Sequence, residues 1–418
     1  MKTMHLKNLL FVFSITVSCS VFSSTQNDQI QDLVNQYVEK YSTTDASEQG
    51  EGISGIQLSI LQNSKMKTYV AGTIGHYIKT PATSENLFAW GSITKEFTTA
   101  IILQLQEQGK LNLNQTLQHW FPEKFISDKN KKSIWPMKWA SIKIFQLLNM
   151  TSGIPSTPSG KVFNTKNGMF EKNWKANEIV FVAAEHARSG HCGARECFSP
   201  GSHWSYSNTN YIIAGMIAEK AKHESLENQM HELFKNSGIT AYYIPHERPG
   251  KYLNKMMHGY FYYPETMSLK MKQKGIQNGF DTLNTLQWSG ALGAGGLIGN
   301  TENMTNAVFK LFNNEILTKN LTMILKNKYY INVKNGNSIS ELSKCTKEMC
   351  YGLGVSVNYN KTLGLIWRYE GEISGFRSIY NWVPNNNILI AISVNSSGQY
   401  DHIAKLMTDV LNVATKKK

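Results

Sequence analysis

Hydrophobic residues recur at helical spacing near both ends of the chain. Apolar positions separated by three or four residues form one face of an amphipathic helix. The two sets are Ile30, Leu33, Val34, Tyr37 and Val38 near the start, and Ile403, Leu406, Met407, Val410 and Leu411 near the end. This spacing predicts one helix over 30–38 and another over 403–411.

Strand-like segments lie just inside the first of these helices. Residues 53–61 and 68–74 are rich in β-branched, aliphatic and aromatic side chains, and Asn63 and Ser64 between them are residues that favour tight turns. The pattern predicts a β-hairpin.

Strand-like segments also precede the second helix. Residues 363–367, 376–383 and 388–394 predict three more antiparallel strands. The last two are joined by Pro-Asn-Asn-Asn at 384–387, which is a turn sequence.

The middle of the chain has a different pattern. Residues 116–284 read mostly as helix and loop, with helices expected over 142–150 and 208–222. A loop rich in Ser, Pro, Gly and Asn is expected over 152–168. Strands at both ends of the chain with helices between them indicate an α/β fold.

The chain has 418 residues, of which 41% are hydrophobic, enough for one large domain or two. We expect an antiparallel sheet flanked by the N- and C-terminal helices. The α/β domain would comprise residues 24–115 and 285–418, and a mainly helical domain, 116–284, would be inserted into it.

The first residues have the composition of a signal peptide. Lysines precede the apolar stretch 9–22, which is short for a membrane span, and a small residue, Ser23, offers a cleavage point. Cys19 is less favoured as a lipoprotein attachment site because Thr16, rather than Leu, stands three residues before it. Residues 1–23 are therefore expected to be a signal peptide, and the mature protein to be periplasmic or secreted.

The remaining cysteines form two pairs of equal spacing, Cys192 with Cys197 and Cys345 with Cys350. No His or Cys cluster completes a zinc-binding pattern beside either pair, so no metal is expected. Two short local disulfides formed in an oxidising compartment are the simplest account.

The chain is basic, with 43 Lys and Arg against 30 Asp and Glu and a formal net charge of +13. The lysines are scattered, and neither a zinc-finger spacing nor an aromatic-basic RNA-binding signature is present, so nucleic acid is not expected as a partner. A basic surface would suit association with an anionic cell envelope.

A candidate nucleophile, Ser92, stands at the start of a predicted helix that ends near Gly109. Lys95 lies one turn later on the same face, within reach of the hydroxyl, and a desolvated lysine can act as a base. The same spacing recurs at Ser64 and Lys67, in the predicted hairpin turn. The pattern alone therefore also fits an N-cap serine.

A second candidate group is Tyr206, followed by Ser207 and Asn208. A phenol can act as an acid or base when a cation lowers its pKa, and Lys95 would be such a cation. Asn208 could hold a substrate amide. The alternative is an ordinary helix start with Asn208 as its cap.

Together these segments resemble a known family. Residues 88–98 (FAWGSITKEFT) resemble the first motif of class C β-lactamases and their DD-peptidase and esterase relatives. Residues 142–155 resemble the family's stretch before its central loop, and Tyr206-Ser207-Asn208 resembles its second motif. Later landmarks, 295–297 and 351–354, follow in consistent order over roughly residues 30–400.

The resemblance implies a β-lactamase/transpeptidase-like fold and acyl transfer through a serine ester, with no cofactor. Ser92 would attack the carbonyl, Lys95 would take its proton, and Tyr206 would relay a proton to the leaving group. The backbone N–H groups of Ser92 and Glu372 would bind the oxyanion. The substrate-binding residues implied are Asn208, Tyr369, Glu370, Gly371 and Glu372.

The third motif departs from the family pattern of Lys-Thr-Gly, His-Thr-Gly or His-Gly-Gly. Here the residues are Tyr369, Glu370 and Gly371, of which only Gly371 matches. An ionised glutamate facing a substrate carboxylate would repel it. Glu370 could point away, with Arg368 or Arg377 binding the carboxylate; the substrate could be an ester or carry an amine; or the protein could bind without turnover.

We therefore expect an exported serine hydrolase that cleaves a small ester or a D-amino-acid amide or peptide, with peptidoglycan peptides among the candidate substrates. A true class C-like β-lactamase is less favoured because the third motif is altered. The non-enzyme alternative is an envelope binding protein or sensor. The presence of Ser92, Lys95 and Tyr206 together argues against that alternative.

Overall fold

The computed structural model describes residues 24–43, 49–127, 132–157, 173–190, 192, 196–244, 250–262, 280–281, 288–346, 349–373, 375–398 and 400–416. The expected signal peptide with Cys19, and residues 158–168 of the expected central loop, lie outside these ranges. Across the described ranges, none of the helices combines the length and the apolar character needed to cross a membrane.

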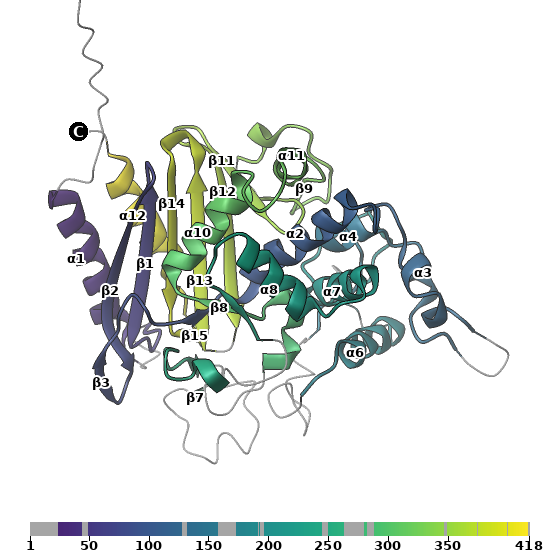
Figure 1. The fold of residues 1–418 in the computed structure, drawn as a ribbon, viewed down its shortest axis with the longest axis horizontal. Coiled ribbons are helices and arrows are strands. Elements are labelled where there is room, and N and C mark those ends of the chain that lie inside the picture. Colours follow the sequence, from purple (N-terminus) through teal and green to yellow (C-terminus); the bar gives the residue numbers. More distant parts are fainter. Residues whose placement is uncertain are drawn as a thin grey trace, which may run out of the picture.

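A nine-stranded antiparallel sheet forms the centre of the molecule (Figure 1). Its strands, in spatial order, are β3 (Ile78–Pro81), β2 (Lys65–Gly75), β1 (Gly55–Gln62), β14 (Ile388–Val394), β13 (Phe376–Val383), β12 (Gly364–Ile373), β11 (Ser356–Asn360), β10 (Cys350–Tyr351) and β9 (Ile331–Asn332). The two ends of the chain meet where β1 pairs with β14, with Ile56 opposite Val394. The expected antiparallel sheet is confirmed.

The strands follow the predicted segments closely. β13 and β14 have the predicted bounds, and the predicted hairpin is formed by β1 and β2. At its turn, Asn63 and Ser64 have φ values of 50° and 65°, a conformation that asparagine adopts more readily than most residues. β12 is longer than predicted and continues past Trp367 to Ile373.

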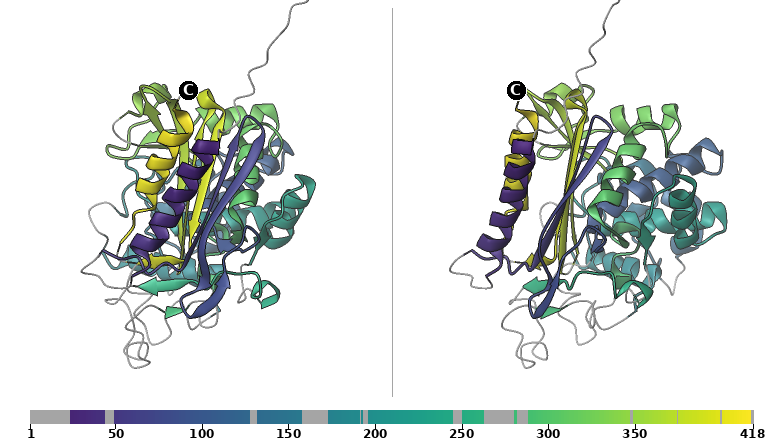
Figure 2. Two further views of the ribbon diagram at one scale, coloured as in Figure 1. Left: turned by 90° about the vertical axis from the view of Figure 1, so that its left-hand side faces the viewer. Right: turned by 60° about the vertical axis from the view of Figure 1, so that its left-hand side comes forward.

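One face of the sheet is covered by the two terminal helices, α1 (Ser24–Tyr41) and α12 (Ile403–Thr415), which lie side by side (Figure 2). Their apolar faces pack on β1 and β14, with Ile30 and Val410 fully buried. Burial of aliphatic side chains at the predicted spacing is the main stabilising contribution of these helices. Both predicted terminal helices are confirmed.

The other described helices lie on the opposite side of the sheet (Figure 2). They are α2 (Thr94–Glu107), α3 (Leu117–Trp120), α4 (Ile144–Leu148), α6 (Ala176–Arg188), α7 (Asn208–Lys222), α8 (Leu226–Asn236), α10 (Thr301–Phe312) and α11 (Lys319–Asn327). Among them, α10 packs on β1 and β14, and others, such as α6, lie further out. α7 has the predicted bounds. α4 is shorter than the predicted 142–150, because Asn149 leaves the helix and Met150 takes a φ of 63°.

Short strands at 242–243, 260–262 and 280–281 lie within residues 116–284, where mostly helix and loop were expected. β5 (Tyr242–Tyr243) pairs with β8 (Leu297–Gly299), which also pairs with β4 (Phe88–Ala89). β6 (Tyr260–Tyr262) pairs with β7 (Phe280–Asp281) and, in parallel, with β15 (Ser396–Gly398). Runs of two or three residues are too short to produce a period-two pattern, which is why the sequence did not indicate β5, β6 and β7.

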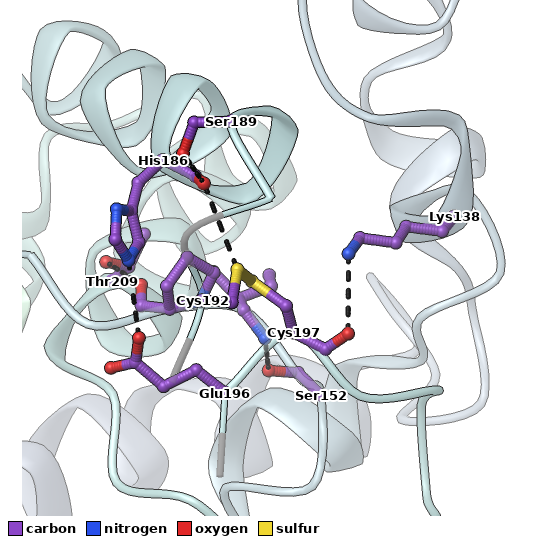
Figure 3. Close-up of a disulfide and its surroundings, with 10 residues drawn as sticks. Lys138, Ser152, His186, Ser189, Cys192, Glu196, Cys197 and Thr209 are labelled. Atoms are coloured by element: carbon purple, nitrogen blue, oxygen red, sulfur yellow. Dashed lines mark hydrogen bonds and ion pairs between the residues drawn. A yellow bond between two sulfur atoms is a disulfide. The ribbon is translucent and has the colours of Figure 1, made fainter. Parts of the chain in front are cut away.

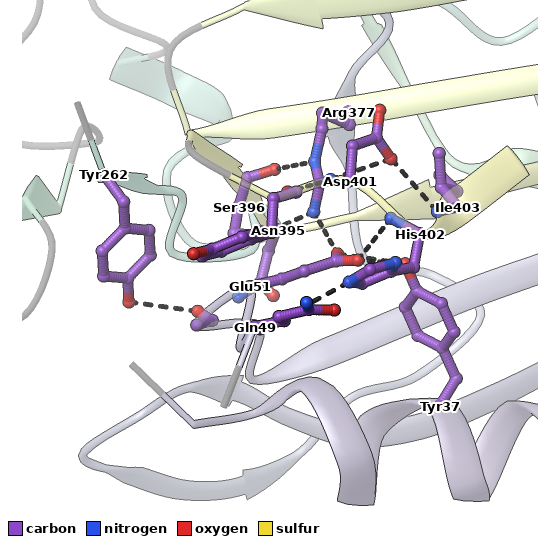
Figure 4. Close-up of polar contacts among 12 residues, drawn as sticks. Tyr37, Gln49, Glu51, Tyr262, Arg377, Asn395, Ser396, Asp401, His402 and Ile403 are labelled. Carbon is purple, nitrogen blue, oxygen red and sulfur yellow. Dashed lines mark hydrogen bonds and ion pairs between the residues drawn. The ribbon is translucent and has the colours of Figure 1, made fainter. Parts of the chain in front are cut away.

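A buried ion pair joins the two ends of the chain at one end of the sheet (Figure 4). Arg377 of β13 pairs with Glu51. The Arg377 side chain is 4% exposed and the Glu51 side chain is 0% exposed. Tyr37 of α1 donates a hydrogen bond of 2.9 Å to Glu51, and the backbone N–H of His402 donates another of 2.6 Å. Asp401 also pairs with Arg377, at 2.9 Å. We call this group the Glu51–Arg377 clasp.

Both expected disulfides are present, Cys192–Cys197 and Cys345–Cys350. The first follows α6, where the Cys197 carbonyl accepts a hydrogen bond of 3.4 Å from Lys138 (Figure 3). The second is fully buried and lies just before and at the start of β10. Each disulfide closes a small loop, so we expect it to make that loop rigid rather than to contribute much to the free energy of unfolding of the whole protein.

Candidate active site

Ser92 lies where β4 turns into α2. A short 3₁₀ turn, Gly91–Ile93, precedes the helix, and Gly91 has a φ of 53°. A Cβ atom on Gly91 would come within 2.8 Å of the Glu372 nitrogen. Glycine is therefore required here both by the backbone conformation and by the close approach of β12.

Two side chains contact the Ser92 hydroxyl. Lys95 Nζ forms a hydrogen bond of 2.9 Å with Ser92 Oγ, and the Tyr206 hydroxyl donates one of 2.7 Å to the same atom. Lys95 also donates a bond of 2.7 Å to the Ala294 carbonyl. The structure thus brings together three residues that the sequence singled out, from the start of α2 and the loop before α7.

Burial changes the acid-base character of Lys95. Its side chain is fully buried, and burial lowers its pKa well below the ordinary value of a lysine. No carboxylate of the described chain forms an ion pair with it. A neutral amine beside a serine hydroxyl is equipped to accept its proton.

Tyr206 differs from the expectation. Burial raises its pKa to about 12, although its contacts with Ser92 and Tyr369 lower it in part. The expectation that Lys95 lowers the pKa of this phenol is wrong, because the buried amine itself loses its proton readily. Tyr206 therefore keeps its proton at neutral pH and is suited to donate it.

The edge of β12 passes directly beside Ser92. β11 pairs with β12 only as far as Arg368, so the segment from Tyr369 onward has β13 alone as a strand neighbour. A Cβ atom on Gly371 would lie 1.9 Å from the Trp90 carbonyl and 3.0 Å from the Ser92 nitrogen. The backbones of Ser92 and Glu372 are thereby brought together, as a two-donor oxyanion site requires.

The strand alternation separates Tyr369 from Glu370. Tyr369 is buried and its hydroxyl lies 2.6 Å from that of Tyr351. Glu370 is exposed on the opposite face, where it pairs with Arg368. Of the three explanations for the altered motif, the structure supports Glu370 pointing away. It does not support Arg368 or Arg377 as substitutes, since Arg368 pairs with Glu370 and Arg377 belongs to the clasp.

Asn208 is the first residue of α7, and its backbone N–H donates a hydrogen bond of 3.1 Å to Ser156 Oγ. Its side chain is half-buried, two residues after Tyr206. Its role in substrate binding stays a prediction.

Tyr211 and Tyr351 also lie at the site. The Tyr211 ring is 5.8 Å from Lys95 Nζ, and the Tyr351 hydroxyl is 2.6 Å from that of Tyr369. In the sequence, Tyr211 follows the second motif and Tyr351 begins the landmark 351–354, but neither is predicted to have a role in the site. A Cβ atom on Gly354 would lie 2.8 Å from the Tyr211 hydroxyl and 2.7 Å from Thr99 Oγ1, so this glycine lets the segment reach α2. No group of three or more His, Cys, Asp or Glu side chains able to hold a metal occurs in the described part of the chain.

A family model described as Beta-lactamase matches residues 30–411. The chain belongs to the Beta-lactamase family. Membership confirms the resemblance seen in the sequence and supports the expected enzyme class, a serine hydrolase.

Among the similar proteins, penicillin-binding protein 4* of Bacillus subtilis is 29% identical over 149 residues, which are 34% of this chain and 27% of that protein. Protein flp of Staphylococcus aureus is 29% identical over 176 residues, 41% of this chain and 31% of that protein. The match thus spans less than a third of the length of either relative.

Solved structures agree with the fold. The D-amino acid amidase of Ochrobactrum anthropi superposes with a TM-score of 0.72 at 20% identity, covering 93% of this chain and 98% of that one. A D-stereospecific amidohydrolase of Streptomyces gives 0.66 at 21% identity, covering 91% and 97%. The octameric penicillin-binding protein homologue of Pyrococcus abyssi gives 0.68 at 20%, covering 93% and 77%. The β-lactamase/transpeptidase-like fold is confirmed.

Proposed function

We propose that the protein is an exported serine hydrolase that works through an acyl-enzyme on Ser92. The observation that carries the proposal is that one hydroxyl is contacted by a buried amine and by a protonated phenol, at 2.9 and 2.7 Å. A nucleophile, a base and an acid at these distances are the parts that acyl transfer needs.

The reaction follows from the proton affinities of these groups. Neutral Lys95 takes the proton of Ser92 as Oγ bonds to the substrate carbonyl carbon, and the oxyanion lies near the backbone of Ser92 and Glu372. The bond to the leaving group breaks as Tyr206 gives it a proton. Tyr206 then regains a proton from the Lys95 ammonium. Water replaces the leaving group, and the same steps in reverse release the acid.

The substrate class we propose is a small ester or a D-amino-acid amide or peptide. The site's phenols are neutral, and neither Arg368 nor Arg377 is available to bind a carboxylate. Substrates that carry no negative charge beside the scissile bond suit such a site. Two structural neighbours are named for activity on D-amino acid amides or D-stereospecific substrates, which supports the same class.

Export is proposed from the N-terminal segment, the four paired cysteines and the basic surface. Disulfides persist in oxidising compartments, and a net charge of +13 suits an anionic envelope. Export would bring the enzyme to peptidoglycan peptides, which are candidate substrates where the leaving group carries no carboxylate.

The test is intact mass over time after mixing the mature protein with a D-alanine ester, a D-alanine amide and a penicillin, while following the loss of each compound. We expect a transient adduct on Ser92 and hydrolysis of the ester or the amide. Ser92→Ala should abolish both. Ser64→Ala is the matched control, because Ser64 precedes Lys67 with the same spacing but lies in the exposed β1–β2 turn.

Each outcome has a separate meaning. A lasting penicillin adduct without drug loss would favour a penicillin-binding, DD-peptidase-like site, and drug loss without a lasting adduct would favour a β-lactamase. An adduct that persists in Ser92→Ala would reject the nucleophile. Failure of every compound to acylate Ser92 would favour the binding-protein alternative.

A further inference from the structure

A groove lies between α8 and the last two turns of α2, two helices that pack against each other (Figure 1). Residues 315–316, which connect α10 to α11, also line it, and its volume is about 480 Å³. A volume of this size is typical of sites for small molecules. We call it the α2–α8 groove. Since α2 begins beside Ser92, the groove lies at the opposite end of that helix from the nucleophile.

The buried wall of the α2–α8 groove is aliphatic. Ile101 and Leu105 of α2, Leu233 of α8 and Ile316 line it, and each is at most 7% exposed. The methylene chain of a ligand would bury apolar surface against this wall, which is favourable in water.

The charged side chains of the groove are mostly acidic. Glu107, Glu232 and Glu315 line it, with Lys222 the one basic residue among its described lining residues. The three carboxylates are exposed, on a chain whose formal net charge is +13. Glu107 lies in the last turn of α2, which contains no basic residue, although the negative end of a helix dipole favours a cation there. These features favour a cationic ligand.

One buried polar group of the groove has an unsatisfied acceptor. Gln229 lines the groove and is only 3% exposed. Its Nε2 donates to the Ala218 carbonyl at 3.1 Å and to the Glu224 carbonyl at 2.8 Å, which fixes the orientation of the amide. Its Oε1 accepts no hydrogen bond from the residues that the structure describes. A buried acceptor without a donor is unfavourable, and an N–H group of a ligand would satisfy it.

We propose that the α2–α8 groove binds a small α,ω-diamine, with its methylene chain on the aliphatic wall. Glu232 lies one turn after Gln229 on the same face of α8, so one ammonium can donate to Gln229 Oε1 beside this carboxylate. The second ammonium would face Glu107 or Glu315. The unsatisfied acceptor selects a ligand that carries N–H groups, and the aliphatic wall disfavours a hydrated metal ion.

The test is isothermal titration calorimetry of the mature protein with 1,5-diaminopentane at pH 7 and low ionic strength. The neutral probe of matched length is 1,5-pentanediol. We expect one saturable site for the diamine and none for the diol. Added salt should weaken diamine binding, because the carboxylates of the groove are exposed. The diamine should also raise the melting temperature of the protein, since it binds the folded state.

Three variants locate the binding. Gln229→Met keeps most of the side-chain volume and removes the acceptor, so affinity for the diamine should fall roughly 10-fold. Glu107→Gln changes an exposed side chain and should weaken binding roughly threefold. Glu123→Gln is the matched control, because Glu123 is also an exposed carboxylate but pairs with Lys220 at 3.5 Å outside the groove. It should bind the diamine like the unmodified protein.

Several outcomes would overturn the inference. They are the absence of saturable diamine binding, equal binding of the diol, and equal weakening by Glu107→Gln and Glu123→Gln. If Gln229→Met does not fold, the comparison of Glu107→Gln with Glu123→Gln decides the question. The inference does not depend on the proposed function: Ser92→Ala should bind the diamine with unchanged affinity, so failure of either proposal leaves the other standing.

Discussion

Two buried basic side chains in this molecule have pKa values that are shifted in opposite directions. Lys95 is enclosed beside Ser92 with no carboxylate partner in the described chain, and burial lowers its pKa. Arg377 is enclosed in the clasp, where burial also acts to lower the pKa, but the charges of Glu51 and Asp401 outweigh it and raise the pKa instead.

The difference shows what burial does with and without a counter-charge. A lone buried amine is pushed toward its neutral form and becomes a base, at a cost in stability. A paired guanidinium stays charged and links α1, β13 and the start of α12. The same loss of hydration thus makes Lys95 a base and leaves Arg377 as a charged structural link.

The largest expected effect comes from removing the unpaired cation. Lys95→Met should lower the acylation rate of Ser92 by about 10³-fold, because the base is lost. It should also raise the free energy of unfolding, because an uncompensated buried amine is replaced by an apolar chain. Stopped-flow acylation and urea unfolding measure the two effects.

The matched control is Lys67→Met at the exposed second Ser-x-x-Lys sequence, which should change neither quantity. Acylation at the unmodified rate in Lys95→Met would contradict the assignment of the base.

The next largest effect is expected when the paired cation, Arg377, is removed. Arg377→Met leaves Glu51 buried without its partner and should cost about 3–5 kcal/mol in the free energy of unfolding. The double variant Glu51→Gln, Arg377→Met should recover part of this loss. Chemical unfolding of the unmodified protein and of both variants measures it, and a cost below about 1 kcal/mol in Arg377→Met would show that the clasp is not a structural tie.

A buried acid extends the comparison. Glu96 of α2 is fully buried, accepts a hydrogen bond from Tyr380, and has no partner for Oε2 among the residues that the structure describes. Burial raises its pKa well above the ordinary value, although the bond from Tyr380 lowers it in part. Glu96 is thus held in its neutral form.

The raised pKa of Glu96 makes the free energy of unfolding depend on pH. Because the folded pKa is raised, the stabilising contribution of Glu96 is complete below the unfolded value of about 4.3 and is lost as pH rises through the folded value. Glu96→Gln should remove this decline and be more stable at pH 8 by on the order of 1 kcal/mol. Unfolding of both proteins from pH 4 to 8 checks it; parallel curves would show that Glu96 does not ionise on unfolding.

The smallest effect is expected at an exposed pair. Glu370→Thr removes the ion pair with Arg368 on the face away from Ser92, so kcat/KM should stay within about twofold and stability within about 0.5 kcal/mol. Steady-state kinetics with a carboxylate-bearing peptide and with its amide measures this. Improved turnover of the peptide alone would show that Glu370 faces the substrate after all.

Much of the sheet could be predicted because its strands carry their own signals. β13 and β14 are apolar runs bounded by turn residues, and the terminal helices have a clear apolar face. β12 was predicted too short because its second half mixes Tyr369 and Gly371 with charged residues. The alternation itself was present, since Trp367, Tyr369 and Gly371 fall on one face and Arg368 and Glu370 on the other.

The site could be predicted only in part. The order of the motifs singled out Ser92, Lys95 and Tyr206, but pKa values depend on burial, which sequence spacing does not reveal. That is why the predicted direction of the Tyr206 pKa shift was wrong. It is also why Glu96, beside Lys95 in the sequence, was overlooked. The contact between Tyr351 and Tyr369 joins two strands separated by β11, which no local pattern indicates.

The pairing of β1 with β14 also constrains the order of folding. Ile56 and Val394 are neighbours in the middle of the sheet, and α12, which covers this joint, comes later still in the chain. During synthesis the N-terminal hairpin has no partner for the inner edge of β1 until almost the whole chain has emerged. Such long-range closure is slow. The central sheet therefore cannot be completed until β14 and α12 have been synthesised.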